Sequence, residues 1–239
     1  MKELNTITDQ MASEESGLSS QNLQRRNFLK MAGGGLAGIA LLNFASCTKD
    51  DGPSDMGGRD FYFGSGDIAI LNYAYALEQL EAAFYIEVAN KPFSGMTEME
   101  KALLTDMRDH EVAHREFFKA ALKDGAIKQL EFDFSSVNFS SRDSVLGTAK
   151  VFEDLGVSAY NGAGWLIKDE NYLLLAGKIV SVEARHAAVV RDLIDNGSFA
   201  NSEVIDGNGL DVSNSPTKVI QAAAPFIKSK IDVRDLPTY

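Results

Sequence analysis

The sequence is poor in several residue types on which common classes of protein depend. Its 239 residues include one cysteine, which excludes an internal disulfide and a metal site built from several thiolates. Only three histidines are present, and two of them follow a glutamate by three residues. Positive charge is also scarce: 23 basic residues face 34 acidic ones, for a formal net charge of -11. An acidic chain argues against nucleic acid as a partner, because a basic face would be expected there.

The N-terminal region has an apolar run that is too short to span a bilayer. Residues 31–44 form a Gly-rich run of about 14 residues, whereas a spanning helix needs roughly 20. Residues 24–30 precede it, and their pair Arg25-Arg26 followed by Phe, Leu and Lys closely resembles the twin-arginine export signal. We therefore predict a signal peptide at 1–47, with the twin-arginine translocase as a partner during export.

The single cysteine, Cys47, ends this run. The sequence Phe44-Ala45-Ser46-Cys47 resembles a bacterial lipobox, except that Phe44 stands where Leu is usual. This resemblance implies lipidation of Cys47, a membrane contact through that anchor, and a place in the cell envelope, periplasmic or lipid-anchored. We expect residues 48–64 to be a polar tether.

The remaining residues, 65–239, have the pattern of one helical domain. Apolar residues recur at three- and four-residue steps in four stretches, which predict helices at 67–90, 97–123, 141–167 and 170–195. Thr97 and Glu100 form a capping box, and Gly125 is expected to supply the left-handed residue that ends the second helix. A short helical run is predicted at 215–224.

Residues 126–140 alternate apolar and polar side chains, which in isolation is typical of a strand. Since no partner strand is evident, we interpret the segment as an extended crossover lying over the helices. The third helix contains Gly147, Gly156, Gly162 and Gly164, each costing up to about 1 kcal/mol relative to alanine. Close packing against a neighbouring element would offset that cost.

The first half of the domain carries a glutamate, a tyrosine and an E-x-x-H motif in order. Glu78 is followed by Tyr85 seven residues later, which places both on one helix face. Glu111 and His114 form the E-x-x-H motif on the next helix, 33 residues after Glu78. Glu81 is an alternative to Glu78 as a ligand, and we favour Glu78 because its spacing to a tyrosine is repeated. Glu81 is then expected to be a carboxylate at the rim of the site, next to the ligands.

The second half repeats this order. Glu153 is followed by Tyr160 seven residues later, and Glu183 and His186 form a second E-x-x-H motif 30 residues after Glu153. Residues three apart share a helix face, so each motif presents one carboxylate and one imidazole to the same ion. Four inward carboxylates would repel each other and be costly to desolvate, which indicates two divalent cations between them. The other two glutamates could bridge the pair or bind one ion each.

The first motif also admits a different interpretation. His110 precedes Glu111, so residues 110–114 match the H-E-x-x-H signature of zinc proteases. That enzyme would need a third ligand elsewhere, and the duplication would then be accidental. We therefore expect His110 to lie at the bundle edge or to bond a neighbouring carboxylate.

These motifs resemble the di-metal carboxylate centre of the ferritin-like superfamily, over roughly residues 65–230. Residues 71–85 look like the bacterial ferritin-like branch often described as desiccation-related. The resemblance implies an all-α four-helix bundle with a long crossover between helices two and three and a short C-terminal helix. It also implies that Tyr85 and Tyr160 hydrogen-bond the ligand carboxylates, although buried tyrosines are more often plain core residues.

The expected ligands are Glu78, Glu111, His114, Glu153, Glu183 and His186. Ligands of this type suit two iron ions, with two manganese ions or zinc as alternatives. The resemblance implies an oxidoreductase that reacts with O2 or peroxide, in a ferroxidase, peroxidase or catalase-like manner. The alternative is a non-enzymatic envelope protein that binds metal for protection against stress such as desiccation. The oligomeric state is left open.

Overall fold

The structure, a computed structural model, describes residues 61–239. These residues belong to the second of two compact units, which spans Pro53–Tyr239. Residues 1–60 lie outside the described part. They contain the predicted export motif (Arg25 and Arg26), the candidate lipidation site (Cys47) and most of the predicted tether. Within the described part, none of the helices combines the length and the apolar character of a membrane span.

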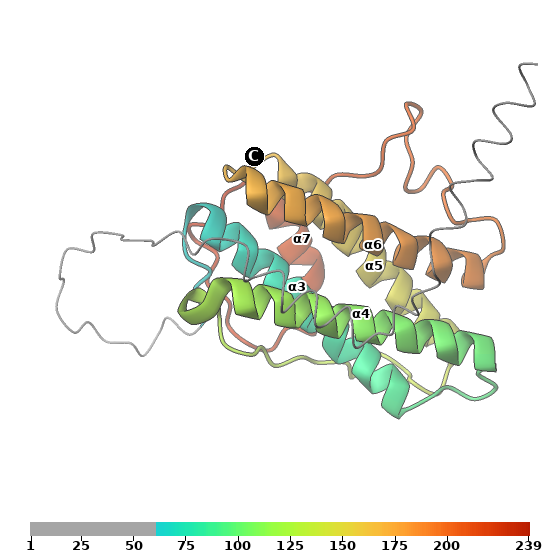
Figure 1. Cartoon of the computed structure of the whole chain (residues 1–239). Coiled ribbons are helices and arrows are strands. Elements are labelled where there is room, and N and C mark those ends of the chain that lie inside the picture. Colours follow the sequence, from blue (N-terminus) through green and yellow to red (C-terminus); the bar gives the residue numbers. More distant parts are fainter. Residues whose placement is uncertain (1–60) are drawn as a thin grey trace, which may run out of the picture. The chain divides into compact units, whose positions relative to one another are not determined.

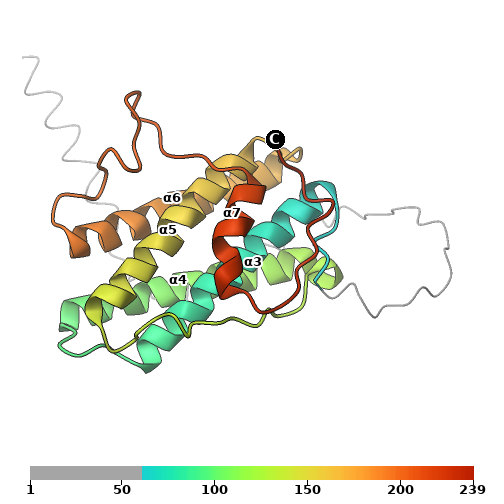
Figure 2. The same cartoon turned by 180° about the vertical axis from the view of Figure 1, so that it is seen from behind.

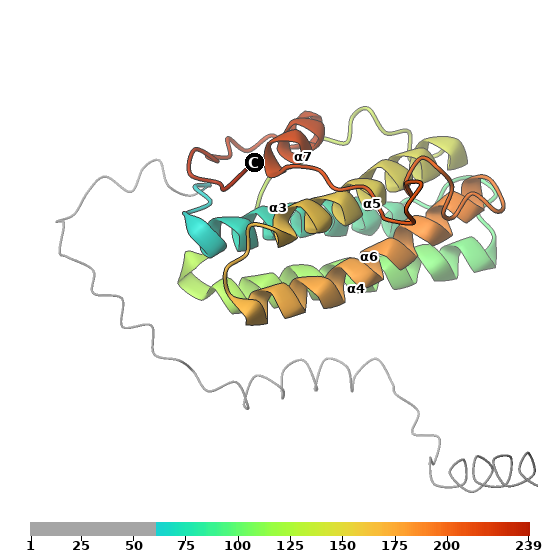
Figure 3. The ribbon, with the colours of Figure 1, turned by 90° about the horizontal axis from the view of Figure 1, so that it is seen from above.

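Four long helices form the body of the domain and confirm the all-α bundle. Their bounds are α3 (Gly66–Asn90), α4 (Glu98–Leu122), α5 (Arg142–Gly164) and α6 (Glu170–Ile194). α3 packs against α4 and α5 against α6, and a second set of contacts joins α3 to α5. Figure 1 shows the two pairs side by side, and Figure 3 shows two layers, α3 with α5 and α4 with α6.

Local chemistry at the helix ends explains most of their bounds. The predicted capping box is present at the start of α4. The Thr97 hydroxyl accepts a hydrogen bond from the backbone N–H of Glu100, and the Glu100 carboxylate accepts one from the backbone N–H of Thr97. The prediction for the end of α4 is wrong, because the left-handed residue is Lys123, with φ 51°, and not Gly125. Gly125 instead ends a short 3-10 helix, η2 (Lys123–Gly125).

The crossover between α4 and α5 is extended and lies against the bundle, as Figure 1 also shows. Ile127, Leu130 and Val137 point their side chains into the core. Phe134 packs its ring against Phe84 of α3, at 6.0 Å between centroids. The alternating pattern therefore arises because one side of the extended crossover packs on the helices. Among residues 61–239, the crossover forms no strand.

The C-terminal region packs across α3 and α5. It contains α7 (Pro216–Ala223) and η3 (Ala224–Phe226), and Figure 2 shows α7 crossing in front of α3 and α5. A Cβ atom at Gly162 would lie 1.8 Å from the backbone oxygen of Asn214, so this glycine permits the close approach that we predicted. At Gly147, by contrast, a Cβ atom would meet nothing within 4 Å.

The folded domain extends N-terminal of Ser65, into the segment predicted to be a tether. Phe63 is fully buried, and its backbone N–H donates to the oxygen of Asp232 over 3.1 Å. The side-chain amide of Asn72 donates to the backbone oxygen of Phe63. The first and last described segments are thus held together beside α3.

Candidate metal centre

The six residues proposed as ligands converge at the centre of the four-helix bundle. Glu78 comes from α3, Glu153 from α5, and the two E-x-x-H motifs from α4 and α6. All four glutamates are fully buried, and the side chains of His114 and His186 are only 13% and 6% exposed. Buried carboxylates at this density are unusual, since proteins rarely bury a charge without a partner.

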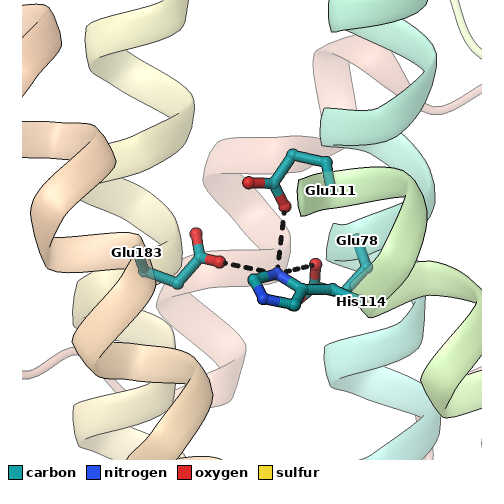
Figure 4. Close-up of side chains that lie close together, drawn as sticks. All are labelled: Glu78, Glu111, His114 and Glu183. Carbon is teal, nitrogen blue, oxygen red and sulfur yellow. Dashed lines mark ion pairs between the residues drawn. The ribbon is translucent and has the colours of Figure 1, made fainter. Parts of the chain in front are cut away.

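His114 lies at the centre of the first group of ligands. Its Nδ1 atom is 3.2 Å from Glu78 Oε2, 3.4 Å from Glu111 Oε2 and 3.1 Å from Glu183 Oε1. Figure 4 shows the three carboxylates pointing at the imidazole from α3, α4 and α6. The E-x-x-H spacing brings Glu111 to His114, because residues three apart share a helix face, and helix packing brings the other two carboxylates.

His186 occupies the corresponding place in the second group. Its Nδ1 atom is 2.7 Å from Glu111 Oε1 and 3.4 Å from Glu153 Oε2. One potential ligand atom each from Glu111, Glu153, Glu183 and His186 lies within 4.8 Å of the others, and the first group meets the same limit. Glu111 and Glu183 belong to both groups, whereas Glu78 and Glu153 belong to one each.

The donor atoms of both groups are poorly satisfied by the protein itself. Among the described residues, eight buried atoms of these six side chains lack a hydrogen-bond partner of acceptable geometry. They include both carboxylate oxygens of Glu111 and Glu183 and the Nδ1 atoms of both histidines. Unsatisfied buried polar atoms are costly, and nitrogen and oxygen donors at this spacing fit two divalent cations.

The pKa values of the buried side chains indicate which of them hold protons when the centre contains no cation. Burial raises the pKa of Glu78 to about 7 and raises the pKa of Glu183 well above its usual range. Burial acts to lower the pKa of His186, but the carboxylates of Glu153 and Glu111 raise it to about 11. Protons therefore take the place of positive charge in the metal-free centre.

Both tyrosines contact the ligand carboxylates, each across the bundle. The hydroxyl of Tyr85 on α3 donates to Glu153 Oε1 on α5, and that of Tyr160 on α5 donates to Glu78 Oε1 on α3. The sequence predicted that each tyrosine shares a face with its own glutamate but not that the contacts cross. Contacts of this kind fix the orientation of a ligand.

Glu81 is a fifth carboxylate in the core and is only 3% exposed. A Cβ atom at Gly156 would lie 3.0 Å from Glu81 Oε1 and 3.1 Å from Glu183 Oε2, so Glu81 reaches the edge of the centre in space that glycine leaves free. Burial, and then the charge of Glu183, raise the pKa of Glu81 well above its usual range. The edge of the centre is where Glu81 was expected, whereas the space that Gly156 leaves for it was missed, although Gly156 follows Glu153 by three residues as Glu81 follows Glu78.

His110 contacts a histidine and not the carboxylate that we expected. Its Nδ1 atom lies 2.9 Å from Nε2 of His186, and the two rings stack with centroids 5.2 Å apart. His110 belongs to neither group of candidate ligands. The arrangement therefore differs from the zinc-protease site, in which both histidines of H-E-x-x-H bind one ion.

The fold and the cluster together define a class of protein: a four-helix bundle whose buried glutamates and histidines could hold metal. The family model described as a ferritin-like domain matches residues 66–196, which is more than half of the chain. The chain belongs to this ferritin-like family. A search of curated proteins finds no match.

Proposed function

We propose that this chain is an exported ferritin-like protein that binds two iron ions and uses them to reduce O2 or peroxide. The observation that carries the proposal is the pair of buried ligand groups sharing Glu111 and Glu183, whose donor atoms lack partners within the protein. Shared carboxylates hold two ions close together, and such a pair supplies electrons to an oxidant placed between them. Two manganese ions, or zinc without redox chemistry, fit the same donors.

The residues around the centre have separable roles in this proposal. Glu78, Glu111 and His114 would bind one ion, and Glu111, Glu153 and His186 the other, with Glu183 shared. Tyr85 and Tyr160 hold the carboxylates of Glu153 and Glu78 in place through their hydroxyl groups. The complete burial of the glutamates excludes water, which strengthens each contact between charges in the centre.

A small cavity beside the centre supports the proposal that the oxidant is a small molecule. It has a volume of about 40 Å³ and is lined almost entirely by apolar side chains of the four long helices and the α5–α6 connection. Tyr160 lines it as well, and the hydroxyl of Tyr160 contacts Glu78. A space of this size accommodates a molecule such as O2 and excludes a large organic substrate.

Metal analysis and turnover on the same samples test the proposal. Anaerobically purified protein is expected to contain close to two iron or manganese ions per chain and to consume peroxide or O2. Glu183→Gln, which keeps the shape of a shared ligand, should lose both properties, while the exposed Glu131→Gln should keep them. Metal binding and turnover that survive Glu183→Gln would refute the proposed centre. Two ions per chain without turnover would instead favour a non-enzymatic role in protection against stress.

Export and anchoring are part of the same proposal and have their own test. The Arg25-Arg26 motif supports the twin-arginine route, and Cys47 supports a lipid anchor. Replacing both arginines with lysine is expected to keep the protein inside the cell. Cys47→Ala is expected to release it from the membrane fraction without blocking export. Membrane association that is unchanged by Cys47→Ala would exclude the anchor.

A further inference from the structure

We propose that a groove on the outer side of α3 and α4 binds a small amphiphilic anion, with one carboxylate and an apolar chain. The groove lies between these helices and the crossover and has a volume of about 940 Å³. Binding sites for small molecules commonly enclose about 300–1,000 Å³. The groove is separate from the metal centre, so the proposal does not depend on metal binding.

One side of the groove is apolar and suits a hydrocarbon chain. Phe132, Phe134 and Phe139 line it from the crossover, and Ile86 lines it from α3. Each of these side chains is only partly buried. Contact with an apolar ligand would remove the remaining surface from water, which is favourable.

The groove also concentrates positive charge on an acidic protein. The chain has a net charge of -11, yet the lining of the groove has five basic residues and two acidic ones: Lys91, Arg115, Lys119, Lys123 and Lys128, with Glu87 and Glu116. Lys91 is paired with Glu87, and Arg115 with Glu116. Neither Lys119 nor Lys123 forms an ion pair with another described residue. These two ammonium groups are available to an anionic head group.

The backbone at Lys123 is the only non-glycine position with positive φ among residues 61–239. Its φ of 51° and ψ of -123° form a conformation that disfavours any residue with a side chain. Gly125 lies two residues further on, so a glycine could have served this turn. Strained residues of this kind are found preferentially at ligand-binding and active sites. The lysine at this position therefore places an ammonium group in the groove at a cost in backbone strain.

A buried amide donor in the wall of the groove is also unused. Gln79 is 1% exposed, and its Oε1 accepts a hydrogen bond from the backbone N–H of Leu130 over 2.8 Å. Its Nε2 has no hydrogen-bond partner among the described residues, and Gln79 lines the groove. The lining of one groove thus contains an N–H donor and two unpaired ammonium groups, which favours a ligand with acceptor oxygens, as a carboxylate has.

Titration of the full chain with laurate, below its critical micelle concentration, tests the proposal. Calorimetry is expected to show about one laurate per chain. Dodecyltrimethylammonium, which has the same chain and the opposite charge, should bind at least about tenfold more weakly, since a charge-assisted contact contributes about that factor. Equal binding of the two amphiphiles, or no binding of laurate, would overturn the proposal.

Two variants locate the site. Lys119→Ala and Lys123→Gly should each weaken laurate binding about tenfold, while Lys178→Ala on the exposed side of α6 should leave it unchanged. Lys123→Gly should also raise the thermal unfolding midpoint, because glycine accepts the positive φ. Higher stability with weaker binding distinguishes a ligand contact from a structural role. Laurate binding that neither variant changes would overturn the proposal.

Discussion

The hydroxyl of Tyr85 lies 2.5 Å from Oε1 of Glu153, so a residue in the first half of the duplicated motif orients a carboxylate in the second. Tyr160 and Glu78 form the reciprocal contact. The two halves are therefore cross-connected through hydrogen bonds as well as through the shared carboxylates. Each tyrosine acts on one ligand group, which allows the two groups to be perturbed separately.

Tyr85→Phe should weaken metal binding selectively at the group that contains Glu153 and His186. Loss of a hydrogen bond that orients a ligand typically costs about 10–100-fold in metal affinity. Titration with Co2+, followed by its visible absorption, should resolve one weakened and one unchanged site. Tyr172→Phe, at a half-buried tyrosine of α6, is the control and should change neither. Equal weakening of both sites would show that Tyr85 acts on the bundle as a whole.

His110→Ala should affect the same group as Tyr85→Phe by a different route. The imidazole of His110 contacts Nε2 of His186 and leaves Nδ1 facing the carboxylates. Without this contact the ring of His186 is free to rotate, and we expect about 10–100-fold weaker binding at that group. The group around His114 should be unaffected. Co2+ spectra that match the unmodified protein at both sites would exclude this positioning role.

Gly156→Ala should destabilise the domain by about 1–3 kcal/mol, because the added methyl group would crowd the carboxylates of Glu81 and Glu183. Gly147→Ala on the same helix is the matched control. Its Cβ atom would meet nothing, so it should stabilise the domain by about 0.5–1 kcal/mol. Urea unfolding of both variants measures the difference.

Adding Glu81→Ala to Gly156→Ala tests the cause, since it removes one crowded neighbour. The double variant should recover part of the lost free energy of unfolding. The expected interaction energy between the two neighbouring changes is about 0.5–3 kcal/mol. Strict additivity of the two changes would mean that the methyl group acts elsewhere.

The metal-free domain should lose stability as the pH rises from about 5 to 8. Burial raises the pKa of Glu78 from 4.5 to about 7, so the folded chain keeps a proton that the unfolded chain releases between these values. A pKa raised on folding stabilises below the unfolded value, and this contribution is lost as the pH passes the folded one. Glu78 alone would account for a loss on the order of 3 kcal/mol.

Bound metal should reverse this dependence, because metal displaces those protons and binds more tightly as the pH rises. Thermal unfolding by circular dichroism at several pH values, with added metal or with chelator, measures both effects. Glu78→Gln should flatten the metal-free curve. A metal-free midpoint that is constant or rises from pH 5 to 8 would contradict the prediction.

The four-helix fold could be predicted because its signals are local. Apolar spacing gave the helices to within three residues, and the capping box at Thr97 located the start of α4 to within one. The left-handed residue that follows α4 was assigned wrongly, because Gly125 looked sufficient for that position. Whether Lys123 adopts positive φ depends on how the crossover packs against α3, which is not a local property.

The candidate site was predictable as a set of residues but not as a geometry. The duplicated spacing selected the six side chains that the structure brings together. Which glutamates belong to both groups depends on how far each helix is displaced along its axis, which spacing within one helix does not determine. The contact between His110 and His186 joins α4 to α6, and no pattern within either helix indicates it.

The sharing of Glu111 and Glu183 between both ligand groups bears on how the proposed centre fills. The first ion would neutralise part of the negative charge of the two shared carboxylates and would repel a second cation nearby. The second ion would then bind more weakly than the first. Protein given half of the metal it can hold would contain mainly chains with one ion, and native mass spectrometry would record that single-ion mass as the dominant one.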